Sequence, residues 1–178
     1  MIRLFAAVEI PEEIGVDLVL RQGGIDGARW RPLDALHITL RFGGDLPEDQ
    51  AEDFDAELAA LAAEPFDLTL QGAGSFGEGE RIHAVWAGVR ESAALRRLHE
   101  RCEAAARRAG LKPETRRYTP HVTLAYLNRP DPVQVAAWVQ ANNLLTSEPF
   151  RVTWFGLYSS ALLAGGSRYQ VEREYPLV

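Results

Sequence analysis

Two copies of one tetrapeptide pattern, His-x-Thr-Leu, constrain the fold of this chain more than any other feature. The copies are His37–Leu40 (HITL) and His121–Leu124 (HVTL), 84 positions apart. Each lies in an apolar, β-branched run that favours an extended strand. Because strand side chains alternate between faces, the His and Thr of each copy point one way and the two apolar residues point the other. The sequence therefore predicts two strands that bury one face and present an imidazole and a hydroxyl on the other.

Composition does not account for this repeat. With 7 Thr and 22 Leu among 178 residues, a given His is followed by x-Thr-Leu roughly once in two hundred trials, yet two of the four His have it. A lone His in a strand or helix is more often structural, and we assign that role to His83 and His99. An accident explains one copy but not a second with the same hydroxyl at the same offset. We therefore interpret His37 and His121 as functional residues.

The bulk properties are those of an ordinary globular protein. The chain is 47% hydrophobic, enough for a real core, and no apolar stretch approaches the length of a membrane span. The first ten residues lack a basic leader followed by a long apolar run, so we expect a cytoplasmic protein with no membrane association. The single cysteine, Cys102, falls on the apolar side of a helical pattern and is expected to be buried without a disulfide.

The charge pattern limits the possible partners. A net charge of -6 disfavours a protein that coats long nucleic acid, because affinity for a polyphosphate depends on a cationic surface. A small or terminal phosphate remains compatible, since Arg presents a planar donor fork that matches phosphate oxygens. Six arginines lie near the two motifs in sequence: Arg29, Arg31, Arg41, Arg116, Arg117 and Arg129.

Periodicity and turn residues predict alternating helices and strands. Helices are expected over 11–21, 47–64, 91–109 and 132–141, and strands over 2–9, 29–32, 36–42, 66–71, 81–89, 118–127, 150–158 and 168–175. Gly43 and Gly44 predict a turn. The glycine-rich stretch 72–79 has no G-x-G-x-x-G or Walker spacing leading into a helix, so we interpret it as a hairpin loop.

This order predicts an α+β fold. A division after Val89 gives approximate halves 1–89 and 90–178, each with helices, strands and one His-x-Thr-Leu motif, which we interpret as a decayed internal duplication. We expect one bilobal domain over 1–178, with two mostly antiparallel sheets facing a central cleft and helices on the outer faces. Both imidazoles would then face the shared cleft.

Two facing His-x-Thr pairs suit phosphodiester chemistry. Imidazole titrates near neutrality, so one ring can act as base while the other acts as acid, with no cofactor. The Thr hydroxyls can donate to nonbridging oxygens where negative charge develops. A metal site is the main rival, but no Cys pair, H-E-x-x-H or His-x-His pattern occurs; Gly-x-Ser-x-Gly, the mark of a serine hydrolase, is also absent. We therefore expect neither metal nor cofactor.

The residues also carry a family resemblance. The paired tetrapeptides, the opening Arg3–Pro11 (RLFAAVEIP), the run Arg117–Pro120 (RYTP) and Leu157–Ser160 (LYSS) resemble the two-histidine phosphoesterase superfamily. More narrowly, they resemble the bacterial and archaeal RNA 2′,3′-cyclic phosphodiesterases, historically called 2′-5′ RNA ligases. The similarity covers essentially the whole chain. The tetrapeptides are specific to the superfamily, and the flanking signals point to the narrower family.

The resemblance implies a bilobal fold and metal-independent hydrolysis of a 2′,3′-cyclic phosphate to a 2′-phosphate. His37 would be the proton donor to the leaving 3′-oxygen and His121 the acceptor that activates water, while Thr39 and Thr123 would hold the phosphate. The partners would be RNA termini or small nucleotides that carry a cyclic phosphate, with no obligatory protein partner. The assignment of the two roles rests on the resemblance alone, because the motifs are nearly symmetric.

One position departs from the family pattern. Many relatives carry Arg after the second Thr-Leu-Ala, where this chain has Tyr126. Strand alternation predicts that Arg41 or Arg117 supplies the cation instead. Phe42, Tyr118 and Tyr158 are the aromatic residues that we expect to stack on a base, and Tyr126 is also expected to contact the substrate.

Two alternatives stay open at this point. The same chemistry could act on a 2′,5′-linked oligonucleotide or a cyclic-phosphate metabolite. A module that binds nucleotides or RNA ends without turnover is the other, although binding alone does not require a paired acid and base.

Overall fold

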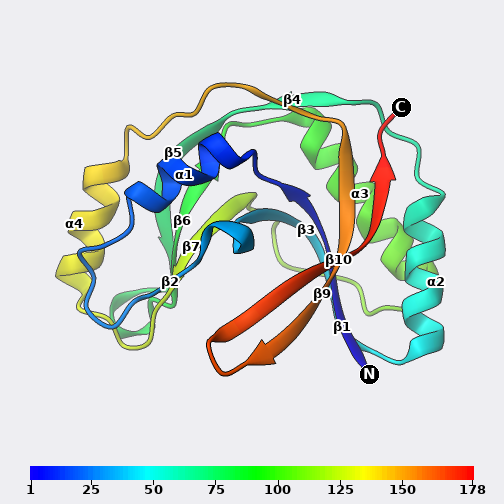
Figure 1. The fold of residues 1–178 in the computed structure, drawn as a ribbon, viewed down its shortest axis with the longest axis horizontal. Helices are drawn as coiled ribbons and strands as arrows, with labels where there is room; N and C mark the ends of the chain where they lie inside the picture. Colours follow the sequence, from blue (N-terminus) through cyan, green and yellow to red (C-terminus); the bar gives the residue numbers. More distant parts are fainter.

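Strands and helices alternate along the chain as the sequence predicts, and the computed structural model describes residues 1–178 (Figure 1). The α-helices are α1 (Glu12–Leu20), α2 (Glu48–Ala59), α3 (Ala93–Arg108) and α4 (Pro132–Asn142). The strands are β1 (Ile2–Glu9), β2 (Arg29–Trp30), β3 (His37–Leu46), β4 (Phe66–Leu68), β5 (Leu70–Phe76), β6 (Ala84–Val89), β7 (His121–Tyr126), β8 (Phe150–Val152), β9 (Trp154–Leu163) and β10 (Gly166–Pro176).

All recorded strand pairs are antiparallel. The main sheet has the order β10-β9-β1-β3-β7-β6-β5, with β2 paired to β7, and β4 and β8 form a separate two-stranded sheet. The expected α+β class with antiparallel sheets is thus confirmed. The sequence halves interleave in space, because β9 and β10 from the end of the chain pair beside β1, while β5 and β6 pair beside β7.

The two motif strands lie at the junction of this sheet. Strands β3 and β7 pair at a single position, Ile38 opposite Val122, which are the apolar second residues of the two motifs. Both side chains are fully buried. This one point of pairing joins the group β10-β9-β1-β3 to the group β7-β6-β5 and brings together segments that lie 84 residues apart in the sequence.

The helices cover the face of the sheet that carries Ile38 and Val122. Helices α2 and α3 lie on the β1 side and α1 and α4 on the β5 side, as Figure 1 shows. Their buried residues join one large core with those two side chains; Leu18, Phe54, Leu95 and Trp138 are examples. A second, small cluster of Phe5, Ala7 and Tyr158 packs separately from this core. Cys102 is buried in the large core, as expected.

Two glycine signals were misread from the sequence. The stretch 72–79 was expected to be a loop, yet β5 continues to Phe76 and pairs with β6. The indole of Trp86 lies close to Gly74, where an added Cβ would be 2.5 Å from the ring, so this glycine permits a close approach inside a strand. The expected turn at Gly43 and Gly44 is also within a strand, at a register shift in β3 where Gly44 has a positive φ of 78°.

None of the helices is both long and apolar enough to span a bilayer.

Truncation at the junction tests how much the sheet depends on it. We expect Ile38→Ala to lower the free energy of unfolding by about 2–5 kcal/mol, because a fully buried side chain is replaced by a cavity. Urea denaturation followed by circular dichroism measures this change. Val133→Ala, at a position that is 75% exposed, is the control and should change stability by no more than about 0.5 kcal/mol. Equal losses in both variants would contradict this account of the junction.

Candidate active site

The register at the junction places the four polar motif residues together. Continuing the antiparallel register from the Ile38–Val122 pair sets His37 across from Thr123 and Thr39 across from His121. Since Ile38 and Val122 point into the core, these four side chains point to the opposite face. Each imidazole therefore lies beside the hydroxyl of the other motif, an arrangement with approximate twofold symmetry.

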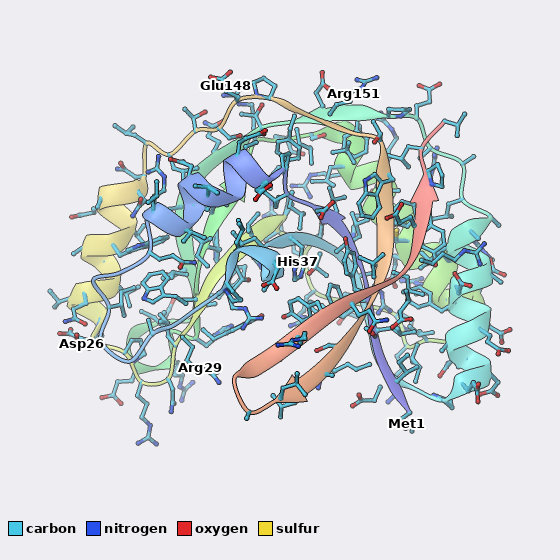
Figure 2. The ribbon with its side chains drawn as sticks, in the orientation of Figure 1. Met1, Asp26, Arg29, His37, Glu148 and Arg151 are labelled. Atoms are coloured by element: carbon cyan, nitrogen blue, oxygen red, sulfur yellow. The ribbon has the colours of Figure 1, made fainter.

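That face opens into a cleft of about 930 Å³ that all four residues line. Figure 2 shows His37 in the middle of the molecule and Arg29 near its edge. The walls come from the start of β1, from β2 and the residues after it, from β3, β7 and the β9–β10 hairpin. The other lining residues are Met1, Arg3, Leu4, Phe5, Arg29, Trp30, Arg31, Pro32, Phe42, Gly44, Asp45, Tyr126, Ser160, Leu162, Gly165, Gly166, Ser167 and Tyr169.

Both imidazoles are held in the same way. The Nδ1 of His37 lies 2.8 Å from the carbonyl oxygen of Ala35, and the Nδ1 of His121 lies 2.6 Å from that of Thr119, two residues earlier in each case. A carbonyl oxygen only accepts, so Nδ1 carries the hydrogen in both rings. In the neutral ring Nε2 is then an acceptor with a free lone pair. The main chain thus fixes the tautomer that makes Nε2 available for proton transfer.

Aromatic rings pack against each imidazole. The His37 ring lies 4.8 Å from Phe5 and 5.3 Å from Tyr169, centroid to centroid. The His121 ring lies 4.7 Å from Phe76 and 5.9 Å from Trp86. These contacts fix the ring planes and exclude water from their sides.

Burial makes both imidazoles weak bases in the free protein. The pKa of His37 is lowered to about 4, chiefly by desolvation; the positive charges of Arg31 and His121 also lower it, and the hydrogen bond to Ala35 opposes the shift. Desolvation also lowers the pKa of His121, against its hydrogen bond to Thr119. At neutral pH both rings are therefore neutral in the free protein.

The placement expected for Arg41 is wrong, and a β-bulge explains why. Ala7 pairs with Thr39 but the next β1 residue, Ala6, pairs with Arg41, so Leu40 is an extra residue in β3. The extra residue moves Arg41 to the face opposite Thr39. Its side chain is 8% exposed, and its guanidinium donates to the Glu103 carboxylate and to the carbonyl oxygens of Phe42 and Lys112. Arg41 therefore braces the structure behind β3 and does not line the cleft.

The main-chain carbonyls beside this bulge are also held from behind. The Tyr118 hydroxyl donates to the carbonyl oxygen of Thr39 at 2.8 Å, and His99 Nδ1 donates to that of Leu40 at 2.8 Å. The rings of His99 and Tyr118 stack at 3.7 Å. His99 thus has the structural role expected for it, whereas Tyr118, which was expected to stack on a base, instead fixes the strand that carries Thr39.

Of the other residues expected to contact the substrate, two line the cleft and two do not. Phe42, 56% exposed, and Tyr126 line the cleft. Arg117 is exposed and is not among the lining residues. Tyr158 is buried, stacks on Phe5 at 5.3 Å and also does not line the cleft, so its ring packs beneath the site.

Arginines and a tyrosine of the cleft are among the lining residues that were missing from the sequence-based set of site residues. Arg3, Arg29 and Arg31 give the cleft positive charge, and Tyr169 faces His37. The crowding of Arg29 and Arg31 before the first motif was a signal for two of them. No sequence signal placed Arg3 or Tyr169 in the cleft, because the position of Arg3 depends on the pairing of β1 with β3 and that of Tyr169 on the pairing of β10 with β9.

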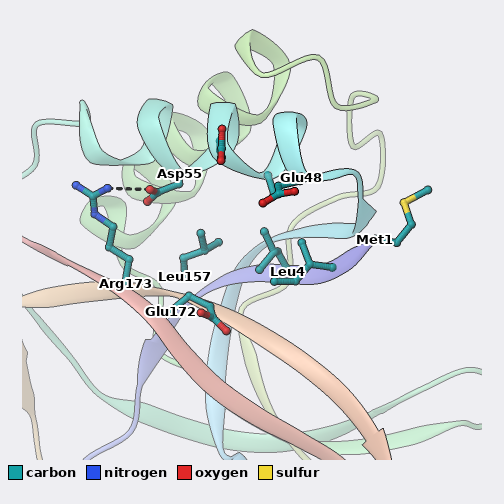
Figure 3. A pocket seen from close by; sticks show the side chains of 10 residues that line it. Met1, Leu4, Glu48, Asp55, Leu157, Glu172 and Arg173 are labelled. Atoms are coloured by element: carbon teal, nitrogen blue, oxygen red, sulfur yellow. Dashed lines mark hydrogen bonds and ion pairs between the residues drawn. The ribbon is translucent and has the colours of Figure 1, made fainter.

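A second hollow of about 440 Å³ lies between α2, β1 and β10 (Figure 3). Its polar lining is mostly acidic, from Glu48, Glu52, Asp55 and Glu172, and Arg173 is paired with Asp55 at 2.8 Å. Carboxylates of this density repel an anion. Of the two hollows, only the cleft with the motif residues can hold a phosphate. No group of three or more His, Cys, Asp or Glu side chains is arranged to hold a metal ion.

Antiparallel α+β lobes that meet at paired His-x-Thr strands over a basic cleft define a class of phosphoesterase-like folds, and comparison with known proteins narrows it. Residues 20–162 match the family model described as the 2′-5′ RNA ligase superfamily. The chain belongs to this family.

Curated relatives and a solved structure agree with this assignment. The chain is 33% identical over 188 residues to the RNA 2′,3′-cyclic phosphodiesterase of Thermus thermophilus, covering 98% of this chain and 90% of that one. It is 40% identical over 90 residues to that of Aeropyrum pernix, and here the match spans about half of each chain. The crystal structure of E. coli LigT complexed with 3′-AMP superposes with a TM-score of 0.80 at 25% identity, covering 99% and 98% of the two chains.

The protonation states of the two imidazoles can be measured directly. We expect NMR titration of the free protein to show His37 neutral down to about pH 4 and His121 neutral at pH 7, each with the hydrogen on Nδ1. Burial is the cause, because it disfavours the charged form. A short histidine-containing peptide is the reference for a solvated ring. A His37 ring that titrates together with this peptide would contradict the buried environment described above.

Proposed function

We propose that this protein hydrolyses a 2′,3′-cyclic phosphate on RNA ends or small nucleotides to the 2′-phosphate, by metal-independent acid and base catalysis with two histidines. One observation carries the proposal: two imidazoles with free Nε2 atoms share one cleft, each beside the other motif's threonine. The family membership and the activity named for the Thermus relative support the same substrate class.

The reaction is an in-line displacement at phosphorus. His121 Nε2 takes a proton from a water whose oxygen forms a bond to phosphorus. The bond from phosphorus to the 3′-oxygen breaks, and that oxygen receives a proton from His37 Nε2. The products are a 2′-phosphate and a free 3′-hydroxyl, and a proton exchange between the rings and solvent restores the starting state.

His37 can act as the proton donor only if substrate binding raises its pKa. With a pKa of about 4, His37 is neutral at neutral pH in the free protein, so its Nε2 carries no proton to donate. An anionic phosphate in the cleft opposes the charge of Arg31 and favours the imidazolium, so it raises the pKa of His37. The donor is then protonated mainly when the substrate is in place.

Thr39 and Thr123 would donate hydrogen bonds to the nonbridging oxygens. Both hydroxyls line the cleft, and the strand register fixes each beside an imidazole. Donors that are already oriented stabilise the charge that develops on phosphorus oxygens at little reorganisation cost.

Removal of either imidazole tests the acid and base pair. We expect His37→Ala and His121→Ala each to lower kcat for a 2′,3′-cyclic mononucleotide by about 10²–10⁴, the usual contribution of a positioned acid or base. Phosphorus NMR identifies the product, which we expect to be the 2′-phosphate, and added EDTA should leave the wild-type rate unchanged. His83→Ala, an exposed His outside the cleft, is the control.

Three outcomes would overturn parts of this mechanism. Full activity in either variant would remove the acid and base pair. A 3′-phosphate product would reverse the polarity of attack, and loss of rate with EDTA would introduce a metal.

The threonines give a milder and separable effect. We expect Thr39→Val and Thr123→Val to lower kcat by about 10- to 100-fold, because each loses one hydroxyl donor and keeps the side-chain shape. Steady-state kinetics measures this change, and thermal denaturation checks that the fold is kept. Unchanged kcat in both variants would show that the hydroxyls do not contact the reacting phosphate.

A further inference from the structure

The cleft contains one arginine that the fold holds in place. The main-chain N–H of Arg31 donates to the carbonyl oxygen of Leu124 at 2.8 Å, which extends the pairing of β2 with β7 alongside the second motif. The carbonyl oxygen of Arg31 accepts from the Gln22 side chain at 2.8 Å. The backbone of Arg31 is therefore fixed to the strand that carries His121 and Thr123.

Two tyrosines orient its side chain. The guanidinium carbon lies 5.5 Å from the ring centroid of Tyr126 and 5.5 Å from that of Tyr169. Both distances suit a cation on an aromatic face. One nitrogen also donates to the Tyr169 hydroxyl at 3.2 Å, across 138 residues of sequence.

This guanidinium keeps most of its donors free. Its hydrogen bond to Tyr169 is the only one that its side chain makes, and the eight ion pairs of the protein all involve other arginines. A guanidinium has five N–H donors in a planar fork, so at least two remain for an anion. Arg41 shows the opposite case, because a carboxylate and two carbonyls occupy its fork behind the strand.

The other two arginines of the cleft lack this support. Arg3 and Arg29 are exposed, whereas Arg31 is half-buried, and neither of the exposed side chains has a hydrogen-bond partner or an aromatic face beneath it. An exposed, unrestrained cation loses more side-chain entropy when it binds an anion. It also gains less electrostatic free energy, because the surrounding water has a high dielectric constant. Figure 2 shows Arg29 near the edge of the molecule, away from His37.

We propose that Arg31 is the residue that binds the nonbridging oxygens of the substrate phosphate, with Tyr126 and Tyr169 holding its guanidinium in position. The inference rests on the proposed function for the identity of the substrate. Arg31 thereby takes the role that the sequence had suggested for Arg41 or Arg117. Tyr126 and Tyr169 are positioning residues in this arrangement, since they act through the guanidinium.

The same placement connects phosphate binding to the His37 ring. Tyr169 contacts both Arg31 and His37, and the charged or titratable groups that face His37 are Arg31, His121 and Tyr169. Arg31 opposes protonation of His37 while the cleft is empty. A bound phosphate removes this opposition, so substrate entry and loading of the proton donor are linked.

Inorganic phosphate tests the inference without relying on turnover. Wild type, Arg31→Ala, Arg31→Lys and Arg97→Ala are titrated with phosphate by calorimetry, and the imidazole pKa of His37 is followed by NMR with and without phosphate. Arg97 is an exposed residue of α3 outside the cleft, so Arg97→Ala loses the same charge and is the matched control. Thermal denaturation of each variant checks the fold.

We expect Arg31→Ala to weaken phosphate binding by about 10- to 100-fold, the range for losing a charge-assisted contact. The pKa of His37 in the free variant should rise, which a purely structural role of Arg31 would not cause. Arg31→Lys should bind several-fold more weakly than wild type, because a point charge replaces a fork, and it keeps the test decisive if the alanine variant does not fold. Arg97→Ala should match wild type in both measurements.

Phosphate binding within twofold of wild type in Arg31→Ala, or in Arg31→Lys where the alanine variant is unfolded, would overturn the inference. The two proposals can also fail separately. If wild type binds phosphate through Arg31 but does not open a 2′,3′-cyclic mononucleotide, the proposed function is wrong and the role of Arg31 stands. If wild type cleaves the nucleotide and Arg31→Ala cleaves it equally well, the proposed function stands and Arg31 has no part in it.

Discussion

The pairing of Ile38 with Val122 is the constraint on which the site depends. It is the only ladder pair between β3 and β7. Both side chains are fully buried, so the apolar residues of the two motifs point into the core. Strand alternation then leaves no choice for His37, Thr39, His121 and Thr123, which must share the other face. A one-residue slip at this position would bury the polar groups and expose the apolar ones, so the core enforces the register that the chemistry needs.

The polar groups around the cleft show a division of work between faces of the sheet. Behind β3, the side chains of Arg41, His99 and Tyr118 donate hydrogen bonds to a carboxylate or to main-chain carbonyl oxygens. These bonds stabilise the bulged strand. On the cleft face, the imidazole Nε2 atoms and most N–H groups of the Arg31 guanidinium make no hydrogen bond within the protein. Groups satisfied within the fold give rigidity, and unsatisfied groups at the surface of a cleft are available to a ligand.

Much of the fold was predictable from the sequence. The four helices, the motif strands and the antiparallel α+β class follow from periodicity, capping residues and strand spacing, which are local properties. The wrong predictions came from glycines, which occur both in turns and within irregular strands. Gly74 was expected to lie in a loop, although it pairs within a strand, where its lack of a side chain leaves room for the Trp86 indole. Gly44 was read as a turn, although it accompanies a register shift within β3.

The sequence by itself determined that two strands would each present an imidazole and a hydroxyl on one face, because a period of two is built into any strand. Only the tertiary structure decided which cation accompanies them. The bulge at Leu40 reverses the alternation, so that Arg41 lies on the back of β3. Simple alternation along the sequence does not predict such an extra residue. The cleft instead receives Arg31, oriented by Tyr169 from the far end of the chain, a contact that exists only once β10, β9, β1 and β3 have paired in order.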